Sequence, residues 1–382
     1  MAKPSTEPAP KAGGQTLRDR FRRTMHFEIP NRLPFFEFGY WEETLPAWHE
    51  QGLPRNVDTE AKAYEYFGIE DMLYAPVHQG LLPLGKREII EETDDHITFR
   101  EPDGVIGQEQ KGTFKTIPHY IDFPIKSRSD WQWFRERLSP DTPGRLPEDF
   151  ADEVRKLNAS DAPVRLSFIS LCGILRNWMG FENYAIATLT EPDFVAGMME
   201  DLTVLSVKMI ESAFAAGLKV DVAGGWEDIT FNSGPIVHPD FFYSEAVPRY
   251  KRITNVFRKH GCDVVYVDSD GNITRLVDGW LSGGVNCMFP LEVNGGSDPV
   301  ALRAKYGHRV LLMGGVDKMM LHGTKAEIIR ELERLRPVVE DGAFIPHVDH
   351  RVPPSVPYEN YLYYLDAKRD MFNAGRLEPR YK

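Results

Sequence analysis

Residues 262–294 read CDVVYVDSDGNITRLVDGWLSGGVNCMFPLEVN. The segment opens with an apolar run that ends on Asp268 and Asp270, continues through a stretch with helical spacing, and closes on a second apolar run. Short apolar runs without polar alternation are typical of parallel strands that are buried on both faces. The segment therefore predicts a strand, a helix and a second strand parallel to the first.

The same alternation extends over the second half of the chain. Helical stretches separate the apolar runs, and several open on Asp, Ser or Thr and close on Gly, as helix caps do. This regularity leaves an eight-stranded barrel or an open doubly wound sheet. We expect the barrel, because no GxGxxG or P-loop is present and polar residues recur at the strand ends. Seven strands can be assigned in the sequence, so one strand of the barrel stays unassigned. The predicted strands lie in residues 33–41, 164–170, 218–228, 262–272, 284–294, 309–317 and 343–350.

The remaining segments complete the predicted architecture. Residues 1–16 are rich in Pro, Ala, Gly and Ser and predict a disordered tail. Residues 17–27 have helical spacing, and residues 82–125 contain β-rich runs separated by turn signals. We expect an α/β fold, a (β/α)8 TIM-type barrel with an N-terminal helical extension and a small β-hairpin insertion, in which residues 17–382 form one domain.

Composition restricts the class of partner. The chain has 382 residues, with 57 Asp and Glu against 45 Lys and Arg, for a net charge of -12. This charge disfavours nucleic acid and anionic membranes as partners, and favours a small molecule or a protein. The three cysteines have no CxxC spacing, so they predict neither disulfides nor a thiolate zinc site. Without a secretory signal or a long apolar segment, we expect a cytoplasmic protein.

In a barrel, the residues at the C-terminal ends of the strands are the candidate site residues, because the loops after the strands converge over one mouth. The residues collected in this way are mostly acidic. Many carboxylates around one mouth need a metal, a proton or a cationic ligand to offset their repulsion. The candidates are Glu37, Tyr40, Trp41, Glu227, Asp268, Asp270, Asn272, Glu292, Lys318, Asp349 and His350.

Three of these residues form a predicted metal site. Asp268 and Asp270 are two residues apart, so on an extended strand they lie on the same side, and His350 can add a nitrogen ligand. Such a set suits zinc, manganese or iron. The alternatives stay open: the aspartates can cap the following helix, and His350 can pair with Asp349 or a backbone carbonyl.

Two further assignments have structural alternatives. Glu227 follows VAGGW, where the glycines allow either a ligand or a neighbouring strand to approach closely. Tyr40 and Trp41 are candidates for the wall of a substrate pocket, and equally for core aromatics.

Several motifs together indicate a family. They are Arg32-Leu33-Pro34, GGWEDITFNSGPIVHPDFF leading to Pro248-Arg249-Tyr250, Asp268 to Asn272, PLEVNGGSDPVALRAKYG, LLMGGVDK and VPPSVPYENY. On these the chain resembles the uroporphyrinogen decarboxylase superfamily, which includes methylcobamide:thiol methyltransferases. The resemblance implies a (β/α)8 barrel with its pocket at the C-terminal mouth.

The chain departs from both branches at their key motifs. Decarboxylases carry M-R-Q-A-G-R after the first strand's proline, whereas here Pro34 precedes FFEFGYWEE. Losing paired guanidinium contacts costs several kcal/mol for a polyanionic tetrapyrrole, which disfavours that substrate. The methyltransferase zinc motif His-x-Cys-Gly matches Asp268 to Gly271, and its later Cys falls near His350, so hard donors replace thiolates.

The resemblance and the residues together favour a corrinoid-dependent methyltransferase component. It would move a methyl group between a small O- or N-methylated compound and a cobalamin-binding protein docked over the mouth. A homodimer is implied by analogy. The alternatives are a decarboxylase or lyase of a small carboxylate, anchored by Lys318, Arg351 or Arg176, and a non-catalytic binding barrel. In the leading hypothesis Asp268, Asp270 and His350 hold the metal, Glu227 or Asp349 manages the proton, and Glu37, Tyr40, Trp41, Asn272, Glu292 and Lys318 bind substrate.

Overall fold

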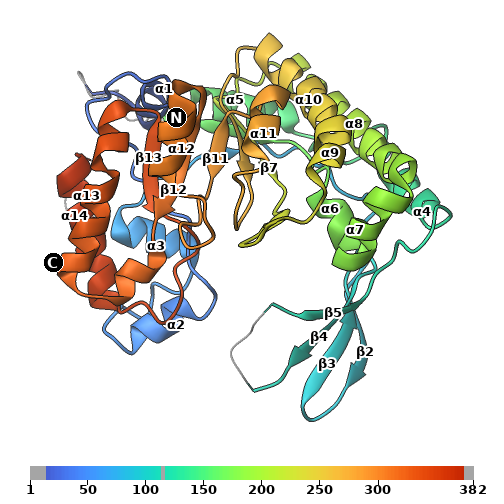
Figure 1. Cartoon of the computed structure of the whole chain (residues 1–382), viewed down its shortest axis with the longest axis horizontal. Helices are drawn as coiled ribbons and strands as arrows, with labels where there is room; N and C mark the ends of the chain where they lie inside the picture. The colour runs from blue at the N-terminus through green and yellow to red at the C-terminus, as the bar shows by residue number, and fades with distance from the viewer. Residues whose placement is uncertain (1–13, 113–116, 374–382) are drawn as a thin grey trace, which may run out of the picture.

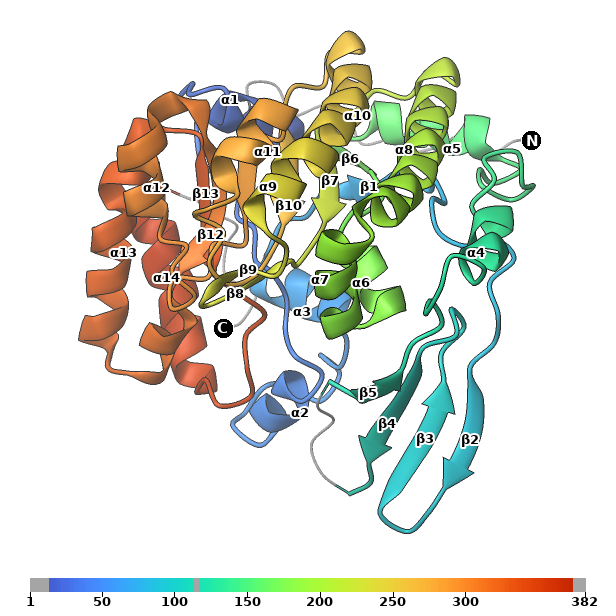
Figure 2. The ribbon, with the colours of Figure 1, turned by 45° about the vertical axis from the view of Figure 1, so that its right-hand side comes forward.

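A curled parallel sheet of seven strands forms the centre of the protein (Figures 1 and 2). The computed structural model describes residues 14–112 and 117–373. Every neighbouring pair in this sheet is parallel. Its strands, in spatial order, are β1 (Leu73–Tyr74), β6 (Val164–Ser167), β7 (Val222–Trp226), β10 (Val265–Asp268), β11 (Cys287–Phe289), β12 (Leu311–Val316) and β13 (Phe344–Val348). The six strands predicted in the second half are confirmed, and β1 is the strand that the sequence left unassigned.

Helices pack around the outside of the curled sheet (Figure 2). The predicted N-terminal helix is confirmed as α1 (Leu17–Met25), which opens with a capping box between Thr16 and Asp19. The other helices are α2 (Thr44–His49), α3 (Glu60–Phe67), α4 (Trp131–Arg137), α5 (Phe150–Ala159), α6 (Gly173–Met179), α7 (Phe181–Thr190), α8 (Pro192–Ala215), α9 (Pro239–Phe241), η1 (Phe242–Ala246), α10 (Val247–Lys259), α11 (Val277–Gly283), α12 (Pro299–Tyr306), η2 (Gly307–Arg309), η3 (Lys318–His322), α13 (Lys325–Asp341) and α14 (Tyr358–Phe372).

An irregular segment, residues 33–41, takes the eighth position of the barrel. The sequence predicts a buried strand here; this is wrong, since the segment contains only isolated bridge residues, Leu33 and Tyr40, of which Tyr40 pairs with Val352. Side chains replace the missing ladder: the Glu37 carboxylate accepts from the Val348 amide at 3.3 Å, and the Lys368 ammonium donates to the Phe36 carbonyl at 2.9 Å. The fold is thus a (β/α)8-type barrel whose eighth strand is not hydrogen-bonded into the sheet.

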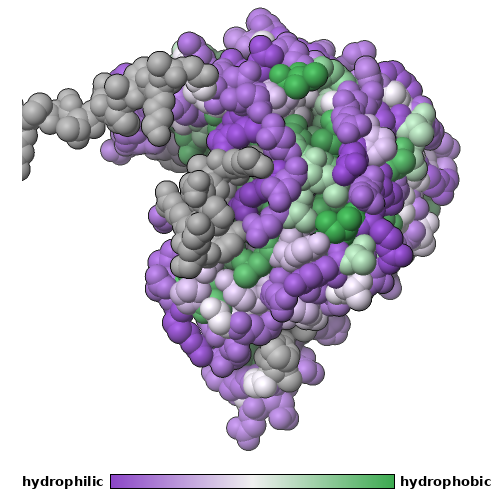
Figure 3. Space-filling view, turned by 90° about the vertical axis from the view of Figure 1, so that its left-hand side faces the viewer, coloured by the Kyte–Doolittle hydropathy of each residue, from purple (hydrophilic) through white to green (hydrophobic). Residues whose placement is uncertain are grey.

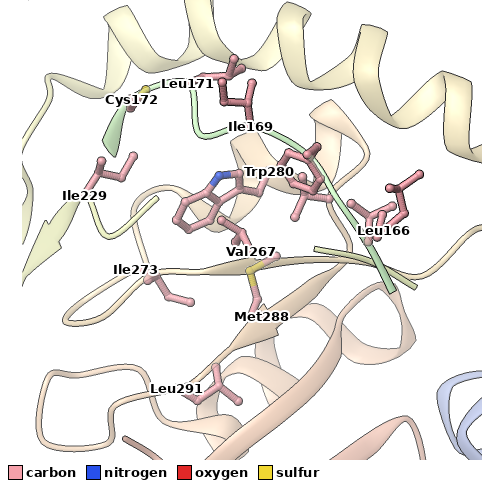
Figure 4. Close-up of a cluster of buried hydrophobic side chains, with 14 of the residues drawn as sticks. Leu166, Ile169, Leu171, Cys172, Ile229, Val267, Ile273, Trp280, Met288 and Leu291 are labelled. Carbon is pink, nitrogen blue, oxygen red and sulfur yellow. The ribbon is translucent and has the colours of Figure 1, made fainter. Parts of the chain in front are cut away.

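Two apolar cores lie on the two sides of the sheet. The inner core joins Phe21 and Met25 of α1 to strand residues such as Val264 and Leu311, so α1 closes the N-terminal end of the barrel. The outer core fills the space between sheet and helices. Trp280 of α11 is fully buried there, and Figure 4 shows it in the middle of side chains that include Val267.

The predicted insertion is larger than a hairpin. A four-stranded antiparallel sheet projects from the barrel (Figure 1), consisting of β2 (Glu88–Glu92), β3 (His96–Arg100), β4 (Ile106–Gln110) and β5 (His119–Asp122). A small hairpin, β8 (Thr230–Phe231) with β9 (Gly234–Pro235), follows β7. The predicted small antiparallel insertion is therefore confirmed, with four strands instead of the two of a single hairpin. The predicted tail, residues 1–16, lies outside the described residues up to residue 13.

The surface contains no extended apolar belt on the face that Figure 3 presents. Hydrophilic side chains dominate this face, and hydrophobic ones occur in separate patches. Among the described helices, none combines the length and apolar character needed to span a bilayer.

Candidate active site

Three potential metal ligands meet at the C-terminal ends of the strands. Asp270 follows β10, Glu292 follows β11 and His350 follows β13, and one ligand atom from each lies within 4.8 Å of the others. His350 Nε2 is 3.1 Å from Asp270 Oδ2. Asp270 Oδ1 is buried and has no hydrogen-bond partner among the described residues. We call Asp270, Glu292 and His350 the mouth triad.

The mouth triad differs in one member from the set that the sequence predicts. Asp270 and His350 are brought together, but Glu292, predicted to bind substrate, completes the group instead of Asp268. The reason is local: β10 ends at Asp268, and the chain then turns through Gly271 with φ of 72°. Alternation along an extended strand no longer relates Asp268 to Asp270 once the chain turns.

A lysine bridges Glu292 to a second carboxylate behind it. Lys318 Nζ lies 2.7 Å from Glu292 Oε1 and 3.7 Å from Asp349 Oδ1. Asp349 is fully buried and accepts from the Val293 and Lys318 amides, both at 3.0 Å. Burial raises the pKa of Asp349 to about 6, although Lys318 opposes the rise. Asp349 is therefore held in place by the loops after β11 and β12.

Aromatic rings enclose the imidazole of His350. Trp41 stacks on it with centroids 5.4 Å apart, and Phe38 meets it edge-on at 5.7 Å. Burial lowers the pKa of His350, but the hydrogen bond and charge of Asp270 outweigh this and raise it overall. Trp41, one of the predicted wall residues, thus lies directly against the mouth triad.

Asp268 faces a different space, a pocket of about 170 Å³ inside the barrel. Phe38 also lines this pocket, so the pocket and the mouth triad share a wall. Burial, together with the charges of Asp270 and Asp228, raises the pKa of Asp268 to about 8. At neutral pH the Asp268 carboxyl is thus mostly protonated and can donate a proton. We call this space the barrel pocket.

A second titratable side chain of the barrel pocket is His347. Its Nδ1 lies 2.9 Å from the Val348 carbonyl, which can only accept, so Nδ1 carries the proton and Nε2 is left as an acceptor. Burial lowers the pKa of His347 to about 3. The ring is therefore neutral over the physiological pH range.

Arg165 also lines the barrel pocket, and the sequence reasoning missed it. It lies within β6, whereas only residues at strand ends were considered. A signal was present: period-two alternation in VRLS places Arg165 and Ser167 on one face of the strand and Val164 and Leu166 on the other. A charged residue alternating with buried apolar ones points into the barrel.

Glu227, predicted to be catalytic, is fully buried and saturated with donors. It accepts from Ser170 Oγ at 3.0 Å and from Tyr250 Oη at 2.5 Å. It also accepts the amides of residues 171, 172 and 173 at 2.8, 2.9 and 2.8 Å, at the start of α6. These contacts fix the loop after β6 against β7.

Two other predicted residues contact α14. Glu37 pairs with the buried ammonium of Lys368 and accepts from Tyr364 Oη at 2.9 Å. Tyr40 is buried, and its hydroxyl lies 2.9 Å from that of Tyr361. Both residues therefore connect the irregular segment at residues 33–41 to the outer helix.

The remaining predicted residues lie around the mouth. Asn272 Oδ1 accepts from the Thr274 amide at 3.2 Å. Arg351 donates to the Tyr40 carbonyl and pairs with Glu60. Arg176 pairs with Asp228 at 3.3 Å and borders a neighbouring pocket of about 460 Å³ below the insertion. The three cations proposed as carboxylate anchors, Lys318, Arg351 and Arg176, thus all have acidic partners.

A barrel with an acidic mouth triad and a neighbouring pocket defines an α/β-barrel protein with its candidate site where such barrels place their active sites. The Uroporphyrinogen decarboxylase (URO-D) family model matches residues 151–371, more than half of the chain. The chain therefore belongs to the uroporphyrinogen decarboxylase family.

Two similar proteins were found, one by its sequence and one by its structure. A uroporphyrinogen decarboxylase from Pelobacter propionicus is 23% identical over 250 residues, which cover 62% of this chain and 68% of the relative. A solved methyltransferase from Methanosarcina mazei is 16% identical, with a TM-score of 0.60 over 94% of this chain and 99% of its own. At this identity the likeness shows the shared fold.

The mouth triad meets the chemical demands of a divalent ion. Two carboxylates and an imidazole are donors for zinc, manganese or iron. The unpartnered, buried Oδ1 of Asp270 is the kind of atom that a metal ion satisfies, since buried polar atoms are otherwise hydrogen-bonded. The residues present therefore fit a metal.

Proposed function

We propose that this protein is a corrinoid-dependent methyltransferase component, acting on a small O- or N-methylated compound. The observation that carries the proposal is the mouth triad beside the barrel pocket, with an Asp270 oxygen that has no partner among the described residues. Asp270, Glu292 and His350 would hold a divalent ion, which supplies Lewis-acid polarisation of the heteroatom that leaves the methyl group. A separate cobalamin-binding protein, docked over the mouth, would accept the methyl group.

The chain's own residues have distinct roles in this proposal. An alkoxide or amide is a poor leaving group, so the heteroatom must be protonated or bound to a cation as the methyl group departs. Asp268 supports the first option, because its carboxyl lines the pocket and burial raises its pKa. Trp41 and Phe38 exclude water from His350 by packing against its ring.

Lys318 affects both the charge of the mouth triad and the position of Glu292. Its ammonium holds Glu292 at 2.7 Å and is itself positioned by Asp349. The ammonium of Lys318 offsets part of the acidic charge of the mouth triad. When Glu292 binds a cation, its bond to Lys318 must loosen. Glu227 and Glu37 are committed to structural partners, so the proposal gives them no chemical step.

A second candidate, decarboxylation of a small carboxylate, is favoured by one observation. The barrel pocket combines a protonatable carboxyl, Asp268, with the guanidinium of Arg165. A decarboxylase needs a cationic anchor and a proton for the carbanion that remains.

One assay separates the two candidates. The purified protein is incubated anaerobically with cob(I)alamin and a panel of methoxy and N-methyl compounds, while formation of methylcobalamin and release of carbon dioxide are followed together. We expect methylcobalamin formation by the native protein and at least a hundredfold slower reaction with Asp270→Ala, as removal of a catalytic metal ligand requires. Carbon dioxide release without methyl transfer would replace the proposal with decarboxylation, and neither product would reject both.

A further inference from the structure

Arg165 stands inside the barrel pocket without an acidic partner. It belongs to no ion pair among the described residues, and its one hydrogen bond there runs from Nη1 to Tyr74 Oη at 3.3 Å. Its Nε is buried and has no acceptor. A guanidinium carries five N–H donors, so most of the donor capacity of Arg165 is unused.

Aromatic rings, not carboxylates, hold the guanidinium in place. Its central carbon lies 4.8 Å from the ring centroids of both Tyr74 and Tyr266. Such stacking orients the planar group and leaves its N–H edge free. Asp71 and Asp268 also line the pocket and feel the charge of Arg165, but neither forms an ion pair with it.

The neighbouring strand is shaped to admit this arginine. Gly224 of β7 lies between Arg165 and Tyr266, and a Cβ there would come within 2.5 Å of Arg165 Nε and 2.6 Å of the Tyr266 ring. Any larger residue would push both side chains aside. The absence of a side chain at this position therefore leaves the space in which Arg165 stacks.

The other cation of the pocket already has its counter-charge. Arg351 is paired with Glu60 and donates to the Tyr40 carbonyl. Arg165 is thus the lining cation with donors to spare. The pocket volume is about 170 Å³, which suits a small ligand.

We propose that Arg165 binds the carboxylate of the substrate, so that the methyl donor is a small carboxylic acid bearing an O- or N-methyl group. This inference rests on the proposed function and names its substrate class. Phe38 lines the pocket that contains Arg165 and also packs on His350, so this side chain adjoins both the carboxylate anchor and the mouth triad. Two parallel N–H···O bonds from one guanidinium are the geometry that a carboxylate matches.

The test compares acids with neutral amides of the same shape. Isothermal titrations of the full chain use 4-methoxybenzoate with 4-methoxybenzamide, and methoxyacetate with methoxyacetamide. We expect at least one acid to bind at least tenfold more tightly than its amide. Arg165→Met, which keeps the apolar stem, should abolish that preference. Arg87→Met removes another arginine stacked on a ring, on the insertion, and should retain it.

Two further variants make the outcome decisive. In Asp270→Ala the preference for the acid should persist, because the anchor is Arg165. If Asp270→Ala lost this preference and Arg165→Met kept it, the carboxylate would bind at the metal, and the inference would be overturned. Equal binding of acid and amide, or no saturable binding of either acid, would also overturn it. Should Arg165→Met not fold, Arg165→Lys should still weaken the preference severalfold, since lysine cannot bind in two-pronged fashion.

The two proposals can fail separately. Anchoring of the acid by Arg165 without methyl transfer to cob(I)alamin would leave the inference intact and reject the proposed function. Methyl transfer from neutral compounds that is unchanged in Arg165→Met would support the proposed function and reject the inference about Arg165.

Discussion

At the scale of single residues, a buried carboxylate at a strand end is not by itself a catalytic group. Glu227 receives five donors from the loop after β6 and from Tyr250, so both oxygens are fully engaged. Asp270, by contrast, has a buried oxygen without a partner. Glu227 is therefore a structural carboxylate, whereas Asp270 has an oxygen available to a ligand.

Glu227→Gln tests this distinction. The amide keeps one acceptor and turns a donor toward other donors, so we expect a loss of about 3 kcal/mol or more in the free energy of unfolding. Urea denaturation measures it, and Glu359→Gln, at an exposed pair with Lys325, should leave the free energy of unfolding nearly unchanged. Unaltered stability with abolished activity would instead assign Glu227 to the chemistry.

His347 predicts a specific response to acid. Its pKa is lowered to about 3 in the folded protein, against about 6.5 in the unfolded chain. The unfolded state therefore binds more protons below pH 6.5, and the stability that the neutral ring contributes is lost as pH falls toward 3. His347→Asn retains a donor for the Val348 carbonyl but does not titrate.

Thermal unfolding between pH 7 and pH 4 measures this effect. The native protein should lose stability relative to His347→Asn as the pH falls through this window. A constant difference between the two proteins at every pH would contradict the assignment.

At the scale of elements, the segment at residues 33–41 explains both a success and a failure of the sequence prediction. Its apolar run correctly indicates a buried segment at a strand position, as Phe35 and Phe36 confirm. Periodicity cannot reveal that Glu37 and Lys368 would take over the hydrogen bonds of the neighbouring backbone, because Lys368 lies more than 300 residues away. The side chains that close the barrel are a tertiary feature.

Lys368→Met tests whether this side-chain bridge closes the barrel. The side chains of Lys368 and Glu37 are 1% and 0% exposed, so removing the ammonium leaves a buried charge without its partner. We expect a loss of about 3–5 kcal/mol in the free energy of unfolding, measured by urea denaturation. The double variant Glu37→Gln with Lys368→Met should recover part of it. A single variant as stable as the native protein would refute the bridge.

The candidate site was predictable to the extent that strand ends define it. Asp270, Glu292 and His350 all follow strands whose apolar runs are clear in the sequence, and the barrel geometry brings them together. The role of Asp268 was not predictable, since β10 ends at this residue and strand alternation no longer relates it to Asp270. Arg165 lies inside a strand and is found only by following the alternation of that strand.

At the scale of the whole molecule, the family accounts for the barrel, and the residues at the mouth of the barrel define the candidate site. Membership in the uroporphyrinogen decarboxylase family accounts for the curled parallel sheet and the position of the site. The acidic mouth triad and the separate barrel pocket with Arg165 are features of this chain's residues. The proposed activity requires that the mouth triad bind a metal ion and that the barrel pocket bind an anion.

The most direct test of the account is elemental analysis of anaerobically purified native protein beside Asp270→Ala, His350→Ala and Asp268→Ala. We predict about one equivalent of zinc, manganese or iron in the native protein, absent from the first two variants. Asp268→Ala should retain the metal, because Asp268 faces the barrel pocket and not the mouth triad. Native protein without metal, or metal retained after loss of both Asp270 and His350, would contradict the account.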